Sequence, residues 1–215
     1  MTVKLISYSK GEKDESLQDI IAYTARVSNP SNQDNTETSE RLLRYLIREK
    51  HWSPFEMVSA CLEVTTTRDI ARQLLRHRSF SFQEFSQRYA DPTQDLNFVM
   101  RQARLQDTKN RQNSLDVNDP DLQLEWYKQQ AEVTNTAKKS YEWAIENGIA
   151  KEQARAVLPE GIMESRLYVN GTIRSWIHYI DLRSGHGTQK EHIELARNCA
   201  TALEPIFPMI REFCH

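Results

Sequence analysis

Residues 57–88, MVSACLEVTTTRDIARQLLRHRSFSFQEFSQR, contain the change of pattern that decides the fold. The run 57–67 alternates and is rich in β-branched residues, which predicts a strand. Over 68–75 the apolar residues recur at helical spacing, so that Ile70 and Leu74 can face a core. A strand that passes directly into a helix indicates an α+β fold.

The rest of the chain adds few strands and several helices. Further strands are expected at 3–8 and 165–169, and helices at 17–27, around 42–47, and at 121–147, 151–158, 172–182 and 189–207. Residues 90–120 are rich in Pro, Asp and Asn and predict an irregular excursion. We therefore expect one domain over 1–215, with a small, mostly antiparallel sheet flanked by helices, the long ones in the C-terminal half.

Composition limits the classes of function. The net charge of −2 over 215 residues provides no general basic field for nucleic acid. No apolar run approaches membrane-spanning length, and the N-terminus lacks the apolar core of a secretory signal. Cys61, Cys199 and Cys214 form an odd, widely spaced set that fits a reducing cytoplasm, or the host cytoplasm if the chain is viral. Cys61 and Cys199 are expected to be buried, inert thiols.

The functional argument centres on residues 76–88, RHRSFSFQEFSQR. Arg76, Arg78 and Arg88 are permanently charged planar donors that suit phosphate, and three phenylalanines are interleaved with them. This pattern is typical of a binding site for a ligand that has both an anionic group and a flat ring, as a nucleotide does. Arg68 and Arg72 continue the four-residue spacing upstream, but they are expected to form only a solvated stripe.

Several residues of this stretch have two possible roles. Cations beside His77 would hold it neutral, which favours a structural hydrogen-bonding role over that of a base. Ser86 could be a nucleophile, but no activating base is evident, so a hydroxyl donor to phosphate is preferred. Glu84 lies near several arginines and is expected to pair with and position them.

Two more polar clusters flank this centre. The first is 51–56, HWSPFE, for which a capped turn is the plain alternative. The second contains Arg155, Arg174, His178 and Arg183, of which Arg174 and His178 share a helix face. No His, Cys or Asp pattern has metal-ligand spacing, so no metal site is expected.

The three clusters, in this order, resemble the flavin-dependent thymidylate synthases. The family signature of Arg-His-Arg, seven residues and Ser is intact over 76–86, and ARVSN (25–29), HWSPFE (51–56), ARAVLP (154–159) and the segment 174–183 also match. The likeness extends over about 18–195. Ser53 stands where the family commonly has Thr, and Met57 where His is common.

The resemblance implies a homotetramer with active sites shared between subunits. It implies conversion of dUMP to dTMP, with FAD as cofactor and with NADPH and 5,10-methylenetetrahydrofolate as co-substrates. Residues carried over as FAD contacts are Ser28, Ser53, Arg76, His77, Arg78, Glu84, Thr172, Arg174 and His178. Those carried over as dUMP contacts are Gln73, Arg76, Glu84, Phe85, Ser86, Gln87, Arg88, Arg155 and Arg183.

Arg183 matches the residue that the family uses to activate the pyrimidine. A cation near N3 and O4 of uracil would stabilise the negative charge that develops when C5 attacks carbon. No cysteine lies among the arginine clusters, which favours covalent chemistry carried by the flavin. Two alternatives remain: a nucleic-acid-binding module that uses the stripe of Arg68, Arg72 and Arg76 with the aromatic motif, and a nucleotide hydrolase that uses Ser86 or a metal.

Overall fold

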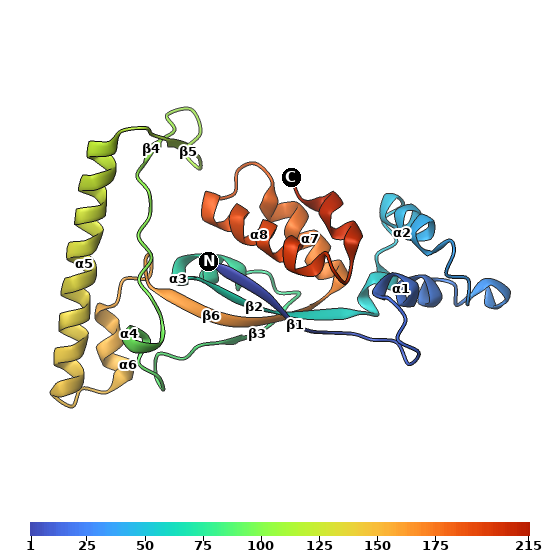
Figure 1. Cartoon of the computed structure of the whole chain (residues 1–215), viewed down its shortest axis with the longest axis horizontal. Helices are drawn as coiled ribbons and strands as arrows, with labels where there is room; N and C mark the ends of the chain where they lie inside the picture. The colour runs from blue at the N-terminus through green and yellow to red at the C-terminus, as the bar shows by residue number, and fades with distance from the viewer.

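A four-stranded antiparallel sheet lies at the centre of the computed structural model, which describes residues 1–215 (Figure 1). The strands are β1 (Thr2–Tyr8), β2 (Ser59–Thr67), β3 (Ser81–Glu84) and β6 (Glu164–Thr172), in the order β1-β2-β6-β3. All three pairings are antiparallel. The prediction of an α+β fold with a small antiparallel sheet is confirmed.

Helices cover one face of this sheet. Ala60, Leu62 and Val64 alternate along β2 and are buried beneath α7 (Ile173–Ser184) and α8 (Lys190–Leu203). The fully buried Trp176 of α7 donates its indole N–H to the carbonyl of Ala60, at 3.0 Å. Burial of this alternating face against two amphipathic helices supplies most of the apolar core.

The opposite face of the sheet has no helix against it (Figure 1). Arg166, Tyr168 and Asn170 of β6 point to this side and are exposed. Cys61 of β2 is half-buried there, so the prediction that it is buried was wrong, whereas Cys199 of α8 is fully buried as expected. The alternation of a strand sends every second residue to the uncovered face, and Cys61 falls on that side.

The N-terminal helices lie at one end of the sheet (Figure 1). They are α1 (Leu17–Ala25), η1 (Pro30–Asn32), α2 (Ser39–Arg48) and η2 (Ser53–Glu56). Ser16 caps α1 as the sequence predicts, because its hydroxyl accepts the backbone N–H of Asp19 at 3.2 Å. The η2 turn packs against both α1 and α7, which brings two of the sequence clusters together.

The other end of the sheet carries an arm dominated by the long helix α5 (Pro120–Glu146) (Figure 1). Beside it lie α4 (Pro92–Asp95), the hairpin of β4 (Arg104–Gln106) and β5 (Ser114–Asp116), α6 (Lys151–Ala154) and η3 (Arg155–Val157). The stretch 90–120 is therefore mostly irregular, as predicted, but contains a short helix and a hairpin that the prediction lacked.

Two glutamines of α5 hold the extended chain that leads to the hairpin. Gln130 accepts the N–H of Arg101 at 2.8 Å and donates to its carbonyl at 2.9 Å. Gln123, two helical turns earlier, does the same for Ala103 at 2.8 and 3.0 Å. The amides replace the backbone partners that a neighbouring strand would supply, so this segment is satisfied without a sheet.

The remaining helices are α3 (Arg68–Leu74) and η4 (Pro208–Phe213). The final helix, expected to fill most of 189–207, ends at Leu203, because Pro205 has no backbone N–H with which to continue the helical hydrogen bonds. No helix is long and apolar enough to span a membrane.

Candidate active site

The Arg-His-Arg motif lies where α3 ends and the chain turns towards β3. Leu75 is the C-cap of α3, and residues 76–80 form the turn that follows. The prediction of a helix-to-loop transition is confirmed. The side chains of Arg76 and Arg78 are exposed and make no hydrogen bond or ion pair within the chain, so both guanidiniums are free to meet an anion.

His77 is held by Arg183, which lies in the last turn of α7. Nε of Arg183 donates to Nε2 of His77 at 2.9 Å, and the His77 ring meets Tyr179 edge to face at 4.9 Å. Burial, followed by the charges of Arg183 and Arg76, lowers the pKa of His77 to about 4. The imidazole is therefore neutral at pH 7 and keeps its proton on Nδ1, because Nε2 accepts.

A second histidine, which sequence reasoning missed, lies beside the half-buried His77. His192 of α8 is completely buried, its ring centroid is 6.3 Å from that of His77, and its Nδ1 is 3.1 Å from Oε1 of Gln73. Burial, Arg183 and His77 lower its pKa to about 3. The signal was present in the sequence, because His192, Leu195 and Cys199 recur at the spacing of one helix face.

Glu84 of β3 contacts two arginines of α3 and a serine of β6. It accepts from Ser165 at 2.7 Å and from Arg72 at 3.1 Å, and it lies 3.5 Å from Arg68. The predicted pairing role of Glu84 is confirmed. Arg68 was expected to be solvated, but it is 8% exposed and also bonds Glu160 at 3.3 Å. Helical spacing could not show that carboxylates from β3 and from residue 160 reach it.

These pairs bear on the nucleic-acid alternative. That alternative requires a free stripe of Arg68, Arg72 and Arg76, but Arg68 and Arg72 already face the carboxylates of Glu84 and Glu160, which leaves only Arg76 free. A paired guanidinium offers little to a phosphate backbone. No observation favours this function over the mononucleotide site.

A pocket of about 420 Å³ opens beside this charge cluster. Its lining includes Arg68, Arg72, Gln87 and Arg155, which brings two of the predicted dUMP residues together with two arginines. Gln87 is 4% exposed and its Nε2 has no partner in the chain. A buried donor without an acceptor is costly, so the pocket suits a ligand that brings oxygen.

The other residues of the motif point to less enclosed positions. The hydroxyl of Ser86 accepts the backbone N–H of Arg88 at 3.4 Å and has no imidazole or carboxylate as a base. Arg88 pairs with Glu152 at 3.1 Å. Phe85 is half-buried, with its N–H bonded to the carbonyl of Arg166 at 2.8 Å.

Most of the predicted flavin residues outside the motif lie near the start of α7. Arg174 forms an ion pair with Glu56 of η2, and His178 packs edge to face on Trp52 at 4.6 Å. Thr172 caps α7 by accepting the N–H of Ser175 at 3.3 Å. Ser53 starts η2, and Ser28 lies in the turn after α1; both are exposed.

Within one chain, the predicted site residues are not all brought together. Arg183 bonds His77, whose ring adjoins that of His192, and His192 in turn contacts Gln73. Gln87 and Arg155 instead line the pocket on the arm side of α3. No hydrogen bond or ion pair links the two groups directly. No group of three His, Cys, Asp or Glu side chains is arranged to hold a metal ion.

The two neutral histidines predict a loss of stability in mild acid. The unfolded chain takes up protons near pH 6.5, but the folded protein resists protonation until about pH 4 at His77 and about pH 3 at His192. The free energy of unfolding should therefore fall by about 3 kcal/mol or more between pH 7 and pH 4. Urea titrations at both pH values measure this. In His192→Gln the decrease should be smaller, and an unchanged decrease would contradict the assignment.

Comparisons with known proteins agree on one family. The family model described as thymidylate synthase complementing protein matches residues 4–209. A probable flavin-dependent thymidylate synthase of Paramecium bursaria Chlorella virus 1 is 50% identical over 212 residues, covering 98% of this chain and 97% of the relative. The flavin-dependent thymidylate synthase of Synechocystis sp. is 48% identical over 216 residues, with the same two shares.

A solved structure agrees as well. The UMP/dUMP methylase PolB from Streptomyces cacaoi, crystallised with 5-Br dUMP, superposes with a TM-score of 0.82 at 26% identity, covering 99% of this chain and 93% of that one. Fold, motif positions and sequence thus lead to the same family over nearly the whole length. This chain belongs to the family of flavin-dependent thymidylate synthases, which are methyltransferase enzymes.

Proposed function

We propose that this protein converts dUMP to dTMP, with FAD as its cofactor and with 5,10-methylenetetrahydrofolate and NADPH as co-substrates. C5 of the uracil ring gains a bond to the methylene carbon and loses its proton. The bonds of that carbon to the two folate nitrogens break, and a hydride equivalent from NADPH reduces it to methyl. The C5 proton and one proton from solvent restore the two N–H bonds of tetrahydrofolate, and NADP⁺ is the other product. We further propose that residues 1–215 act as one domain in this reaction.

The contact between Arg183 and His77 carries the proposal. A neutral imidazole accepts from Nε of Arg183 and so orients the guanidinium without neutralising its charge. The two terminal amino groups have no partner in the chain and present a planar pair of donors. Such a pair matches N3 and O4 of uracil, where negative charge develops as C5 becomes nucleophilic.

The phosphate of dUMP would be held by the motif residues. Arg76 has no protein partner, and Ser86 and Arg88 lie on the turn after β3. Gln87 and Arg155 line the adjoining pocket, where the unsatisfied amide of Gln87 requires an acceptor. Fixing the phosphate converts binding energy into orientation of the ring.

The residues present fit an anionic flavin cofactor. Arg78 is free of protein partners, His77 offers Nδ1–H, and His178 with Trp52 supplies aromatic surface next to Arg174. We assign FAD binding to these residues, with Ser28, Ser53, Arg76, Glu84 and Thr172 completing the set. When bound, FAD would carry reducing equivalents from NADPH to the carbon that is transferred.

Two of the three thiols, those of Cys61 and Cys199, have no role in this scheme. Burial raises the pKa of both Cys199 and Cys61, and neither contacts the arginine groups. A thiol with a raised pKa is a poor nucleophile at neutral pH. The proposed activation of dUMP therefore depends on the charge of Arg183.

We also propose a homotetramer whose active sites take residues from more than one subunit. Gln87 and Arg155 line a pocket that no contact joins to Arg183 in the same chain. A second copy that presents its Arg183 group to this pocket would complete the residue set.

An anaerobic assay tests the proposed reaction. Purified protein with FAD, NADPH, dUMP and 5,10-methylenetetrahydrofolate should form dTMP, detected by chromatography, and omission of FAD or of the folate should abolish the product. The protein should bind FAD and turn yellow. A protein that stays colourless with FAD and forms no dTMP would overturn the proposal.

A further inference from the structure

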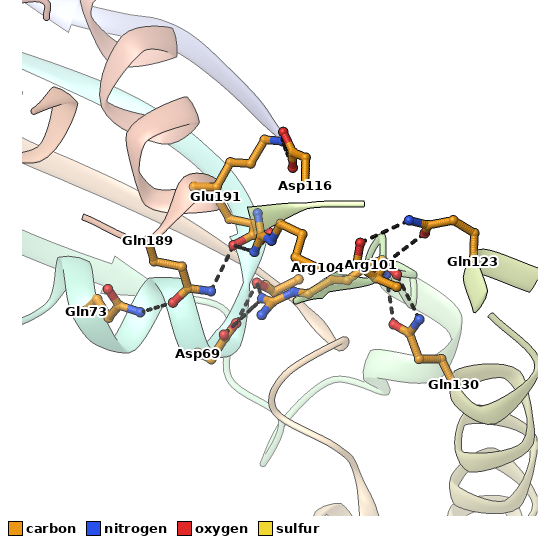
Figure 2. Close-up of polar contacts among 12 residues, drawn as sticks. Asp69, Gln73, Arg101, Arg104, Asp116, Gln123, Gln130, Gln189 and Glu191 are labelled. Carbon is orange, nitrogen blue, oxygen red and sulfur yellow. Dashed lines mark hydrogen bonds and ion pairs between the residues drawn. The ribbon is translucent and has the colours of Figure 1, made fainter. Parts of the chain in front are cut away.

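A directional chain of hydrogen bonds joins the hairpin of the arm to the candidate active site (Figure 2). Nη2 of Arg104, on β4, donates to both carboxylate oxygens of Glu191, at 2.7 and 3.0 Å. Glu191 accepts Nε2 of Gln189 at 2.9 Å, and Oε1 of Gln189 accepts Nε2 of Gln73 at 2.8 Å. Gln73 is the proposed substrate contact on α3.

The chain continues into the core through His192. Oε1 of Gln73 lies 3.1 Å from Nδ1 of His192, which is fully buried. An amide oxygen can only accept, so Nδ1 must carry the proton. The Nε2 of His192 then has no proton, and it has no partner in the chain.

One group sets the direction of all these bonds. An ionised carboxylate can only accept, so Gln189 must turn its NH₂ to Glu191 and its oxygen to Gln73. Gln73 must then turn its NH₂ to Gln189 and its oxygen to His192. If Glu191 were a neutral amide, the links from Gln189 to Gln73 and on to His192 could reverse without losing their partners, while Arg104 would still donate to the one remaining oxygen. The charge of Glu191 therefore determines which way the amide of Gln73 faces.

The structure keeps this carboxylate charged. Burial acts to raise the pKa of Glu191, but the hydrogen bonds from Arg104 and Gln189 outweigh it, and the pKa lies below its usual value. The two side chains of the pair are 15% and 21% exposed, so the bidentate contact is partly shielded from solvent. A second ion pair, Lys190 with Asp116 at 2.7 Å, fastens the same hairpin to the start of α8.

We propose that Glu191, anchored by Arg104, is a positioning residue that fixes the direction of the Gln73 amide towards the substrate. The inference rests on the proposed function and goes beyond it, because neither Glu191 nor Arg104 is among the expected site residues. Gln73 retains one amide hydrogen without a protein acceptor, and this hydrogen is offered to dUMP only when the amide has the observed direction. The hairpin of residues 104–116 thus contributes to substrate binding through Arg104.

Glu191→Gln tests the proposal with a nearly isosteric change. In this variant we expect the neutral His192 ring to move partly or fully from the Nδ1–H to the Nε2–H tautomer, because the chain can reverse. The KM for dUMP should rise about tenfold, with kcat changed less than about threefold. Nitrogen-15 spectra of histidine-labelled protein report the tautomer, and the His192 signals are assigned by their absence in His192→Gln. Steady-state kinetics measure the changes in KM and kcat separately.

Three further variants separate the effect of hydrogen-bond direction from the effects of losing a charge or disturbing the fold. Glu194→Gln removes the same charge from an exposed position on the same helix and should change neither readout. Glu191→Asp keeps an acceptor-only group and should retain the Nδ1–H tautomer. Arg104→Gln releases the anchor but leaves the carboxylate, so it should also retain the tautomer while weakening dUMP binding.

The outcomes distinguish this inference from the proposed function. An unchanged His192 tautomer and an unchanged KM in folded Glu191→Gln would overturn the inference, even if the parent protein forms dTMP. A reversed tautomer in a protein that neither binds nor converts dUMP would overturn the proposed function and leave the hydrogen-bond direction in place. Unfolding of Glu191→Gln shifts the decision to Glu191→Asp and Arg104→Gln, where loss of the Nδ1–H tautomer contradicts the inference.

Discussion

Arg183→Ala should reduce the rate of dTMP formation by about a hundred- to a thousand-fold. Arg183 is the one guanidinium that is oriented by a neutral side chain and still has both amino groups free. Removing it takes away the charge that would stabilise the uracil anion in the transition state, whereas the residues proposed to bind FAD are not substituted. The measurements are the anaerobic rate of dTMP formation and the flavin absorbance of the purified variant.

The controls for this variant separate charge from geometry. Arg183→Lys keeps the charge but loses the planar fork, so it should recover only part of the rate. Arg197→Ala removes an exposed arginine of α8 that bonds only the carbonyl of His215, and it should behave like the parent. An Arg183→Ala variant with near-parental turnover would contradict the assignment of the charge to Arg183.

The same variant has a structural readout that does not depend on catalysis. The charge of Arg183 is the second cause, after burial, of the low pKa of His77. In Arg183→Ala the pKa of His77 should therefore rise towards its usual value, which proton spectra of the imidazole resonances can follow. An unchanged pKa would mean that the observed 2.9 Å contact is absent in solution.

Local pattern predicted the elements whose burial is set by their own periodicity. The alternation of Ala60, Leu62 and Val64 predicted β2, and the cap at Ser16 predicted the start of α1. The strand β3 was not predicted, because four residues carry little alternation and the residues of β6 that pair with it are 83 to 89 positions away. Its existence depends on pairing that no local window contains.

The same distinction applies to the candidate site. The motif identified Arg76, His77 and Ser86, because a concentration of charge and rings is visible in the sequence. The burial of Arg68 and the contact of Glu191 with Arg104 depend on side chains that are 92 and 87 positions apart. Sequence spacing gives no information on contacts between such distant residues. The pairing partners of charged residues were therefore the least predictable part of the site.

Gly171→Ala should lower the free energy of unfolding by about 3 kcal/mol and weaken dUMP binding. Gly171 lies on β6 opposite Ala60, and a Cβ there would lie 2.2 Å from the ring of Phe80. Phe80 closes the Arg-His-Arg turn and is 7% exposed. Its ring is packed between Trp176, at 4.5 Å, and Tyr179, at 5.8 Å, so it cannot retreat without moving the core.

The displaced ring would carry the active-site turn with it, since His77 and Phe80 are linked by a backbone hydrogen bond of 3.2 Å. Thermal and urea unfolding measure the stability, and the KM for dUMP reports the effect of the displaced turn on substrate binding. Gly161→Ala is the matched control, because nothing lies within 4 Å of its Cβ position, and it should stay within about 0.5 kcal/mol of the parent. Combining Gly171→Ala with Phe80→Leu should give a double variant at least about 1 kcal/mol more stable than the two single effects predict. Additive losses would mean that the glycine is not there to admit the ring.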